Sequence, residues 1–288
     1  MRPHAMLCLV TLAGTLTFAA HAQPTPTPQT AHDLVRDVIF NELHDRERDS
    51  HWEYRSNAVT PSQNLVREQV ETSQGPIFRV LERGGRTLDA DQARQEEARL
   101  NEYVKSPGQI EHVQHEHEVD EERLAGIMKM LPKAFLFEYE GSATGDVVRI
   151  AFRPDPAFVP DGYEARVVHV LAGTLTVDQR LKRMIDMDGH LIERVDFGFG
   201  ILGHVEKGGT FEIHRVQVSA ERWKTSLVAV HIQGKVLLFK NVSKDQQETR
   251  SDFRPVPHDI SLQQAKEMLD HQADASLPVE ARLAAGGR

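Results

Sequence analysis

Three glycines in one short stretch have the spacing of a phosphate-binding motif. The segment "FGFGILGHVEKGG" contains G-x-G-x-x-G at Gly198, Gly200 and Gly203. A dinucleotide site of this kind needs a helix directly after the glycines, because the pyrophosphate lies at the helix N-terminus. Here a "KGG" turn signal and the strand-like "TFEIHRVQV" follow instead. We interpret the glycines as bends or close backbone approaches in a curved antiparallel sheet, and we expect no nucleotide cofactor.

A cluster of imidazoles and carboxylates lies in "EHVQHEHEVD", where His112, His115 and His117 alternate with glutamates. Both groups are good ligands for zinc, nickel or copper. The catalytic spacing H-E-x-x-H is absent, however, and an acidic segment of this kind is typical of a solvated loop. We therefore predict a polar loop without a metal, and keep opportunistic metal binding by the three histidines as the alternative.

No other set of residues has the composition of a catalytic site. The G-x-S-x-G signature of many hydrolases is absent, and no serine stands between a strand and a helix. Thiol chemistry would depend on Cys8, the one cysteine. The many carboxylates are typical of a solvated surface. We predict a protein that is not an enzyme and has no cofactor.

The first 22 residues have the pattern of a cleaved secretory signal. Arg2 precedes the apolar run "LCLVTLAGTLTFAA", and Ala20-His21-Ala22 forms an A-x-A cleavage site before Gln23. Cys8 lies inside the apolar run rather than at the cleavage point, which argues against a lipid anchor. We expect a mature protein in the periplasm, without disulfides and without a transmembrane segment.

The charge of the mature chain restricts its partners. Without Arg2, 33 Lys and Arg residues face 43 Asp and Glu residues. Nucleic-acid binding usually needs a basic stripe, so the acidic balance argues against a nucleic-acid partner.

Hydrophobic periodicity divides the rest of the chain into segments. A Pro/Thr spacer at 23–30 precedes a helix that runs to about Asp45, and a three-strand meander follows, in which Trp52 and Tyr54 share a face. A helical insert occupies 87–131, and a β region extends to about Val242. We assign 31–254 to one domain and 255–288 to a C-terminal helix and tail.

The second half of the insert predicts an amphipathic helix that covers something. In "VDEERLAGIMKML", Leu124, Ile127, Met128 and Leu131 follow helical spacing and form an apolar stripe, and Pro132 is expected to end the helix. Such a stripe would cover the open mouth or edge of a sheet.

The long β region predicts a meander with short turns. Asp188-Gly189 has the composition of a type I′ hairpin turn, and Gln233-Gly234 suggests a second hairpin. In "VVHVLAGTLTV" both faces are apolar, so that strand is either covered on both sides or lines an apolar cavity. A meander of this length must curl, which favours a barrel or half-barrel.

Several segments together resemble a known family. They include "FRVLERGGRTLDADQARQEEARL", "LPKAFLFEYEG", "FRPDPAFVP" and the run from "VLAGTLTVDQRLKRMIDMDGHLIERVDF" to the late "SAERW" and "GKVLLFK". The pattern is similar to bacterial secreted proteins of the outer-membrane lipoprotein sorting protein-like group, the LolA/LolB-like superfamily. The resemblance implies an unclosed antiparallel barrel with a helical lid, whose apolar interior takes acyl chains in the periplasm. The insert here is longer than the lid of the sorting carriers, which leaves the cargo open.

These observations predict an α+β, mainly β protein with a curled antiparallel sheet, an unclosed half β-barrel. Its expected function is to carry a lipid or acylated protein in the bacterial envelope without chemistry. The alternatives are an envelope interaction module with a filled core, which would dock to an envelope complex, and a secreted metal-binding protein. The residues expected to line the cavity or its lid are Trp52, Tyr54, Leu124, Ile127, Met128, Leu131, Leu175, Val177, Phe197, Phe199, Phe211 and Trp223.

Overall fold

The computed structural model describes residues 29–48, 51–197, 203–220, 222–236 and 244–276 of the 288-residue chain. The expected signal at 1–22, two of the motif glycines and Phe199 lie outside the described residues. Within them, the helices are α1 (Ala31–Arg48), α2 (Ala90–Tyr103), α3 (Pro107–Ala134), α4 (Tyr163–Val168) and α5 (Leu262–Ser276). The strands are β1 (Trp52–Thr60), β2 (Gln63–Val70), β3 (Ile77–Arg83), β4 (Arg86–Thr87), β5 (Phe135–Tyr139), β6 (Val147–Pro154), β7 (Leu171–Asp178), β8 (Arg183–Leu191), β9 (Val195–Phe197), β10 (Gly203–Val205), β11 (Thr210–Gln217), β12 (Trp223–Ile232), β13 (Gly234–Val236) and β14 (Lys244–Pro255).

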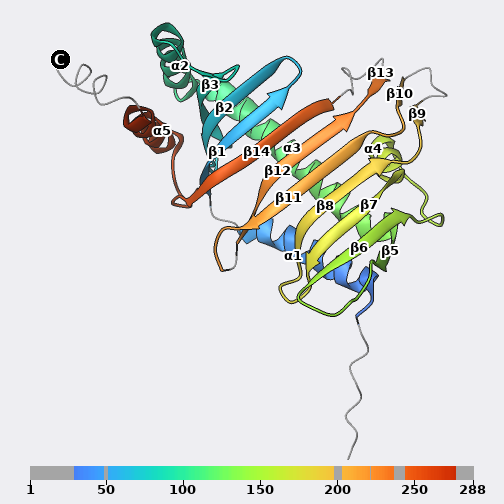
Figure 1. Ribbon diagram of the computed structural model, residues 1–288. Coiled ribbons are helices and arrows are strands. Elements are labelled where there is room, and N and C mark those ends of the chain that lie inside the picture. The colour runs from blue at the N-terminus through green and yellow to red at the C-terminus, as the bar shows by residue number, and fades with distance from the viewer. Residues whose placement is uncertain (1–28, 49–50, 198–202, 221, 237–243, 277–288) are drawn as a thin grey trace, which may run out of the picture.

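The described strands form an 11-stranded antiparallel sheet in the order β4-β3-β2-β1-β14-β12-β11-β8-β7-β6-β5, with β13-β10-β9 as a separate small sheet. The large sheet does not close into a barrel. Strands outweigh helices in the described residues, so the protein is α+β and mainly β, as expected. Strand β1 pairs with β14, which is distant in sequence. This pairing joins the N-terminal meander of β1 to β4 to the rest of the sheet. Figure 1 shows α1 and α3 behind the sheet, with α2 and α5 at its β3 end.

We call the face covered by α1 and α3 the inner face. The core on this side forms where the first helix turns Leu34, Val35 and Val38 onto strands β6 and β7. A second cluster lies at the other end of the sheet, where α2 and α5 enclose Val70 and Ile77. The sheet is therefore anchored at both ends by separate hydrophobic clusters.

The expected first helix is confirmed, and α2 and α5 begin with capping hydrogen bonds. Asp89 and Gln92 form a capping box at the start of α2, in which each side chain accepts a hydrogen bond from the other residue's backbone. Ser261 and Gln264 make the same exchange at the start of α5, with N–O distances of 3.0 and 3.2 Å. The strands of the first meander and the strand after Gly203 are confirmed as well.

The predicted hairpin turn at Asp188-Gly189 is wrong. Strand β8 runs through both residues, and Gly189 lies between Gly173 of β7 and Phe211 of β11. A Cβ at position 189 would come within 2.6 Å of the Phe211 ring, so this glycine permits close approach in a strand rather than a turn. The tertiary contact overrides the local turn signal.

The predicted hairpin at Gln233-Gly234 is also wrong, because the chain leaves the large sheet there. Strand β13 pairs with β10 of the small sheet, and Gly234 stands opposite Val205. A Cβ at 234 would lie 2.5 Å from the carbonyl oxygen of His204. The strand next to β12 is β14, a polar segment that the sequence analysis did not recognise as a strand.

The segment "VVHVLAGTLTV" is not one continuous strand. Val167 and Val168 belong to α4, and β7 begins at Leu171. Strand β7 has Leu175 on its inner face and Thr174 on the other. The appearance of one strand with two apolar faces therefore arose because the sequence analysis joined part of α4 to β7.

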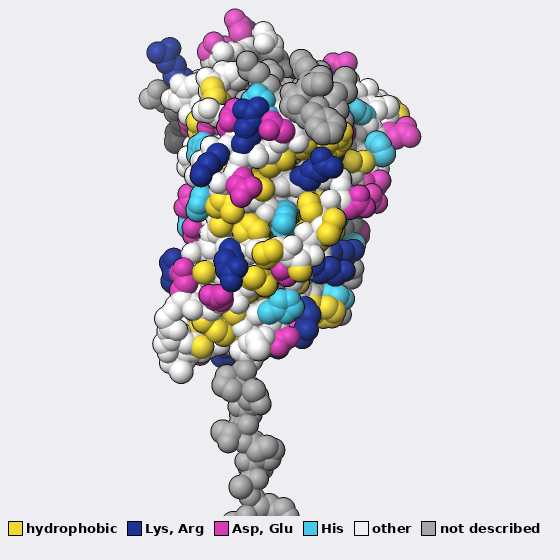
Figure 2. Space-filling model, turned by 90° about the vertical axis from the view of Figure 1, so that its right-hand side faces the viewer, with side chains coloured by type: hydrophobic (Ala, Val, Ile, Leu, Met, Phe, Trp, Pro, Cys, Tyr) yellow, Lys and Arg dark blue, Asp and Glu magenta, His cyan; other side chains and the backbone are white. Residues whose placement is uncertain are grey.

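The sheet ends at β5, and Figure 2 views the molecule from this side. Hydrophobic side chains come to the surface here in several places, with charged and histidine side chains between them. Val147 of β6 is 53% exposed and Val159 is 84% exposed. Charged side chains at an edge discourage pairing with another chain.

Candidate functional site: the inner face of the sheet

Strand register shows how the inner face changes character across the sheet. Directly paired residues in antiparallel strands share a face. One such row runs from Leu175 of β7 to Met187 of β8, Ile213 of β11, Val228 of β12 and Glu248 of β14. This row of the inner face is thus apolar from β7 to β12 and becomes polar at β14.

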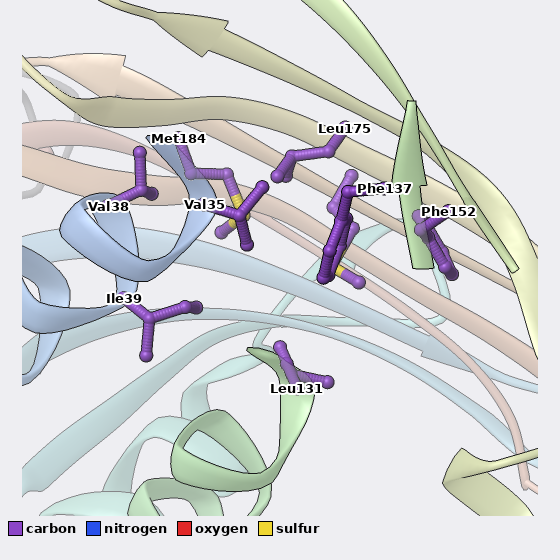
Figure 3. Close-up of a pocket in the computed structure, with 9 residues that line it drawn as sticks. Val35, Val38, Ile39, Leu131, Phe137, Phe152, Leu175 and Met184 are labelled. Carbon is purple, nitrogen blue, oxygen red and sulfur yellow. The ribbon is translucent and has the colours of Figure 1, made fainter. Parts of the chain in front are cut away.

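A small cavity lies at the apolar end, between α1, α3 and the sheet. Figure 3 shows the hydrophobic side chains that surround it. Its lining consists of Val35, Val38, Ile39, Leu131, Phe137, Phe152, Leu175, Met184 and Met187. Its volume is about 20 Å³, which is room for about one water-sized group. An acyl chain does not fit into this cavity as it stands.

Helix α1 is held to the sheet by ion pairs as well as by packing. Glu42, buried on α1, binds Arg215 of β11, and burial lowers the pKa of this guanidinium to about 10. Asp37 pairs with Lys182 at 2.5 Å, and the bond to the Lys182 ammonium lowers the pKa of the carboxyl group. Breaking a buried pair leaves a buried charge without a partner, which is costly. Helix α1 is therefore a fixed part of the inner face.

Helix α3 contacts the rest of the protein mainly at its two ends. Near its start, Ile110 and Val113 pack on the cluster at the β3 end, and near its end Met128 and Leu131 pack on the α1 cluster. Between them, from 115 to 124, every residue except Glu121 is exposed. We call residues 115–124 the α3 span. Figure 1 shows α3 passing behind the sheet from one end to the other.

Below the middle of α3, the inner face is only half-buried. Phe211, Ile213, Val228 and Val230 are large apolar side chains on the inner face of central strands, yet none of them is buried. Residues in these positions of a filled core would be fully buried. The exposed α3 span and the half-buried strands together indicate accessible apolar surface between helix and sheet.

At the polar end of the inner face, three adjacent strands bring charged groups together. Arg250 of β14 donates from Nε to Glu248 at 3.1 Å, and an Nη of Arg67 on β2 lies 3.7 Å from the same carboxylate oxygen. Ser56 of β1 stands between the two arginines. The guanidinium of Arg250 also lies 5.4 Å from the ring centre of Tyr54, close enough for a cation–π contact.

The predicted aromatic site residues of β1 are part of this polar region. Trp52 and Tyr54 are buried, and the Lys224 ammonium lies 5.1 Å from the Trp52 ring. The Tyr54 hydroxyl accepts a hydrogen bond from Gln69 at 2.6 Å, and burial raises the pKa of the phenol. Trp223 lies half-buried on β12, where its carbonyl accepts a hydrogen bond from Arg215.

The predicted stripe on α3 divides between packing and exposure. Ile127, Met128 and Leu131 pack against the hydrophobic clusters below the helix, whereas Leu124 is 42% exposed. Helix α3 also continues past Pro132 to Ala134 instead of ending at the proline. The carbonyl oxygen of Pro132 accepts a hydrogen bond from Nε2 of His32 at 2.9 Å. The stripe is therefore a support at one end of α3 rather than a cover along its length.

The other predicted site residues are spread over the structure. Leu175 and Val177 are buried in the α1 cluster, and Phe211 lies half-buried on the inner face. Phe197 belongs to a different cluster below the small sheet, where its ring meets Tyr163 at an interplanar angle of 79°. The structure thus does not bring all the predicted residues to one site.

The predicted histidine loop is wrong, because His112, His115 and His117 are all part of α3. The segment lacks glycine and proline, so no residue in it breaks the helix that continues through it. Residues 115 and 117 project about 200° apart around a helix, since each residue turns about 100°. No group of metal-binding side chains with the geometry of a site occurs among the described residues.

Sequence reasoning missed several residues of the inner face. The phenylalanines of β5 and β6 and the methionines of β8 line the cavity, and Arg67 and Arg250 form the polar end. Alternation along "QQETRS" places Gln246, Glu248 and Arg250 on one face, with exposed residues between them. This alternation was the local signal for β14. It was not recognised because the residues on both faces are polar, whereas strand prediction depends on alternating apolar residues.

Among the described residues, no helix has the length and apolar composition needed to cross a membrane. In comparisons with known proteins, no family model matches the chain and no curated protein matches it.

Proposed function

We propose that the protein is a carrier of the bacterial envelope that binds the acyl chain of a lipid or an acylated protein on the inner face of its sheet. Binding would involve no covalent chemistry. The observation that carries the proposal is the combination of the exposed α3 span with half-buried apolar side chains on β11 and β12. A slender apolar ligand would gain burial there without breaking the strand ladder.

The sequence pattern of a secretory signal supports a location in the periplasm. A sheet that does not close and that has α1 and α3 on its inner face is compatible with the half-barrel and helical lid that the LolA/LolB-like resemblance implies. In this proposal α1 stays fixed through its ion pairs, and the middle of α3 moves away from the sheet when the ligand binds. Its middle makes few contacts that a ligand would need to replace.

Burial of apolar surface can supply the free energy for binding of an acyl chain. Each apolar side chain that passes from exposed to fully buried contributes about 1.5 to 3 kcal/mol. Phe211, Ile213 and Val228 start half-buried, so each would contribute part of that amount. The ligand's own methylene groups add about 0.8 kcal/mol each when buried.

A test needs an acyl probe and a pair of matched variants. The wild type should bind a dansyl-labelled fatty acid with saturation. Val228→Trp would fill the space under α3 and should weaken binding at least about fivefold. Thr249→Trp places the same side chain on the exposed outer face of β14, and binding should stay unchanged. Absence of saturable binding by the folded wild type would contradict the proposal.

A second candidate is an envelope interaction module with a filled core. The small volume of the cavity below α1 favours it at that end of the sheet. The two candidates differ in what Val228→Trp does to stability. In a filled core the larger side chain should destabilise the protein by about 1–3 kcal/mol, whereas open apolar space would accept it. Thermal unfolding of the variant distinguishes these outcomes.

A further inference from the structure

The polar end of the inner face contains a pair of arginines held in place on neighbouring strands. Ser56 of β1 pairs with Arg67 of β2 on one side and with Arg250 of β14 on the other. All three side chains therefore project from the inner face in one row. Each guanidinium also stacks near an aromatic ring, Arg67 at 5.1 Å from the centre of Phe78 and Arg250 at 5.4 Å from that of Tyr54. The aromatic contacts orient both cations.

The charges in this row do not cancel. Glu248 lies between the arginines and bonds to Arg250 at 3.1 Å, with Arg67 at 3.7 Å. Neither arginine has a second carboxylate within ion-pair distance among the residues that the structure describes. The nearby Glu71 lies 3.9 Å from the ammonium of Lys224, which offsets its charge. Arg67, Arg250 and Glu248 together therefore keep one excess positive charge.

Hydrogen-bonding capacity also remains unused there. The Ser56 hydroxyl and the Nε of Arg67 are both buried, and neither has a hydrogen-bond partner within the described part of the chain. The Ser56 side chain is wholly buried, at 0% exposure. Buried donors in native proteins are nearly always satisfied. Two such donors beside an excess cation form a place where an acceptor with negative charge would be stabilised.

The side chains of Arg67 and Arg250 are accessible to solvent and lie next to the apolar surface of the inner face. The side chains of Arg67 and Arg250 are 19% and 31% exposed. Glu248 stands directly opposite Val228, the half-buried residue under the middle of α3. Apolar surface and cationic row are therefore neighbours on the same face, as an amphipathic ligand would require.

We infer that Arg67 and Arg250 bind the oxyanion of the ligand, a carboxylate or phosphate group attached to an acyl chain that lies along β11 and β12. The inference rests on the proposed function and specifies its ligand class, which is an anionic amphiphile rather than a neutral lipid. Guanidinium groups suit both anions, because their N–H fork matches two oxygen atoms.

The experiment compares two probes with the same acyl chain, one with a charged carboxylate and one with a neutral methyl ester. Dansyl-undecanoic acid and its methyl ester are titrated against the wild type, Arg67→Met and Arg55→Met. Arg67→Met removes one guanidinium and leaves the closer Arg250–Glu248 bond. Arg55→Met is the matched control, since Arg55 lies on the outer face of β1 beside Glu68. Thermal unfolding establishes that each variant is folded.

The wild type should bind the acid about tenfold more tightly than the ester, and this preference should decrease as salt rises from about 50 mM to about 500 mM. Arg67→Met should lose most of the preference by weakening the acid alone, and Arg55→Met should retain it. Equal binding of acid and ester by the wild type would overturn the inference and leave the proposed function standing. Saturable binding of neither probe would contradict both.

Two further outcomes concern the source of the anion and the stability of the variant. Inorganic phosphate at about 1 mM should not displace the acid; complete displacement would show a site for a free oxyanion and overturn the link to an acyl chain. If Arg67→Met does not fold, the wild-type comparison of acid and ester at the two salt concentrations still decides the inference.

Discussion

The ring of Phe211 on β11 occupies the space that a side chain at Gly189 of β8 would need. The two residues are direct partners in the sheet, and a Cβ at 189 would lie 2.6 Å from Cε1 and 2.9 Å from Cζ of the ring. The carbonyl oxygen of Ala172 would lie 2.9 Å away on the other side. The glycine thus lets an aromatic side chain lie flat on the inner face.

Gly189→Ala should therefore destabilise the protein by about 1–3 kcal/mol, the usual cost of overpacking. Gly126→Ala is the control, since Gly126 lies within α3 with open space around its Cα. It should stabilise the helix by about 0.5–1 kcal/mol. Chemical denaturation measures both changes. A Gly189→Ala protein as stable as the wild type would refute the close contact.

Removal of one partner of the buried pair Glu42–Arg215 should destabilise the protein more than replacement of both partners. Glu42→Ala leaves the Arg215 guanidinium buried without its carboxylate and should cost about 3–5 kcal/mol. The double variant Glu42→Met with Arg215→Met should lose less than Glu42→Ala, because no charge stays buried. Glu138→Ala breaks an exposed pair with Arg153 and should cost at most about 1 kcal/mol. A double variant less stable than Glu42→Ala would contradict this account.

Stability should depend on pH through His214. Its ring binds Asp186 and lies 2.7 Å from Glu212, and the bond to Asp186 is the main cause of its raised pKa. A raised pKa in the folded state means that the stabilisation is full below about pH 6.5, the ordinary value, and is lost as pH rises through the raised pKa. His214→Asn should therefore lower the melting temperature more at pH 5.5 than at pH 9. The matched control His190→Asn, exposed on the same outer face, should lack this difference; equal effects at both pH values would refute the role of His214.

Zinc should not stabilise the protein through the histidines of α3. His115 and His117 project in different directions, and His112 already lies 3.5 Å from Glu116. The melting temperature should be the same with zinc, with a chelator, and in the triple variant His112→Ala, His115→Ala, His117→Ala in the presence of zinc. A rise with zinc that the triple variant abolishes would show a metal site here.

Local signals in the sequence were sufficient wherever neighbouring residues decide the structure. Asp89 with Gln92 and Ser261 with Gln264 mark helix starts because the capping bonds join residues three positions apart. The alternation around Trp52 and Tyr54 marks a strand because its side chains meet residues of the adjacent hairpin. The absence of a helix after Gly203 could be deduced in the same way.

Local signals failed where a distant partner decides. Asp188-Gly189 has the composition of a turn, but the ring of Phe211 and the backbone of β7 make it a strand. Gly234 suggests a turn for the same reason, yet the backbone of His204 requires a glycine there. In both cases the contact comes from a strand that the local sequence does not specify.

The candidate site depends most on pairings between segments far apart in the chain. The sequence by itself determined the apolar character of β7, β8, β11 and β12, the starts of α2 and α5 and the mainly β composition. Only the tertiary structure decided that β14 joins β1, that α3 is one continuous helix across the inner face, and that Arg67 and Arg250 flank Ser56. The physical reason is that hydrophobic periodicity records which face of an element is buried, whereas register between distant strands depends on the packing of the whole sheet.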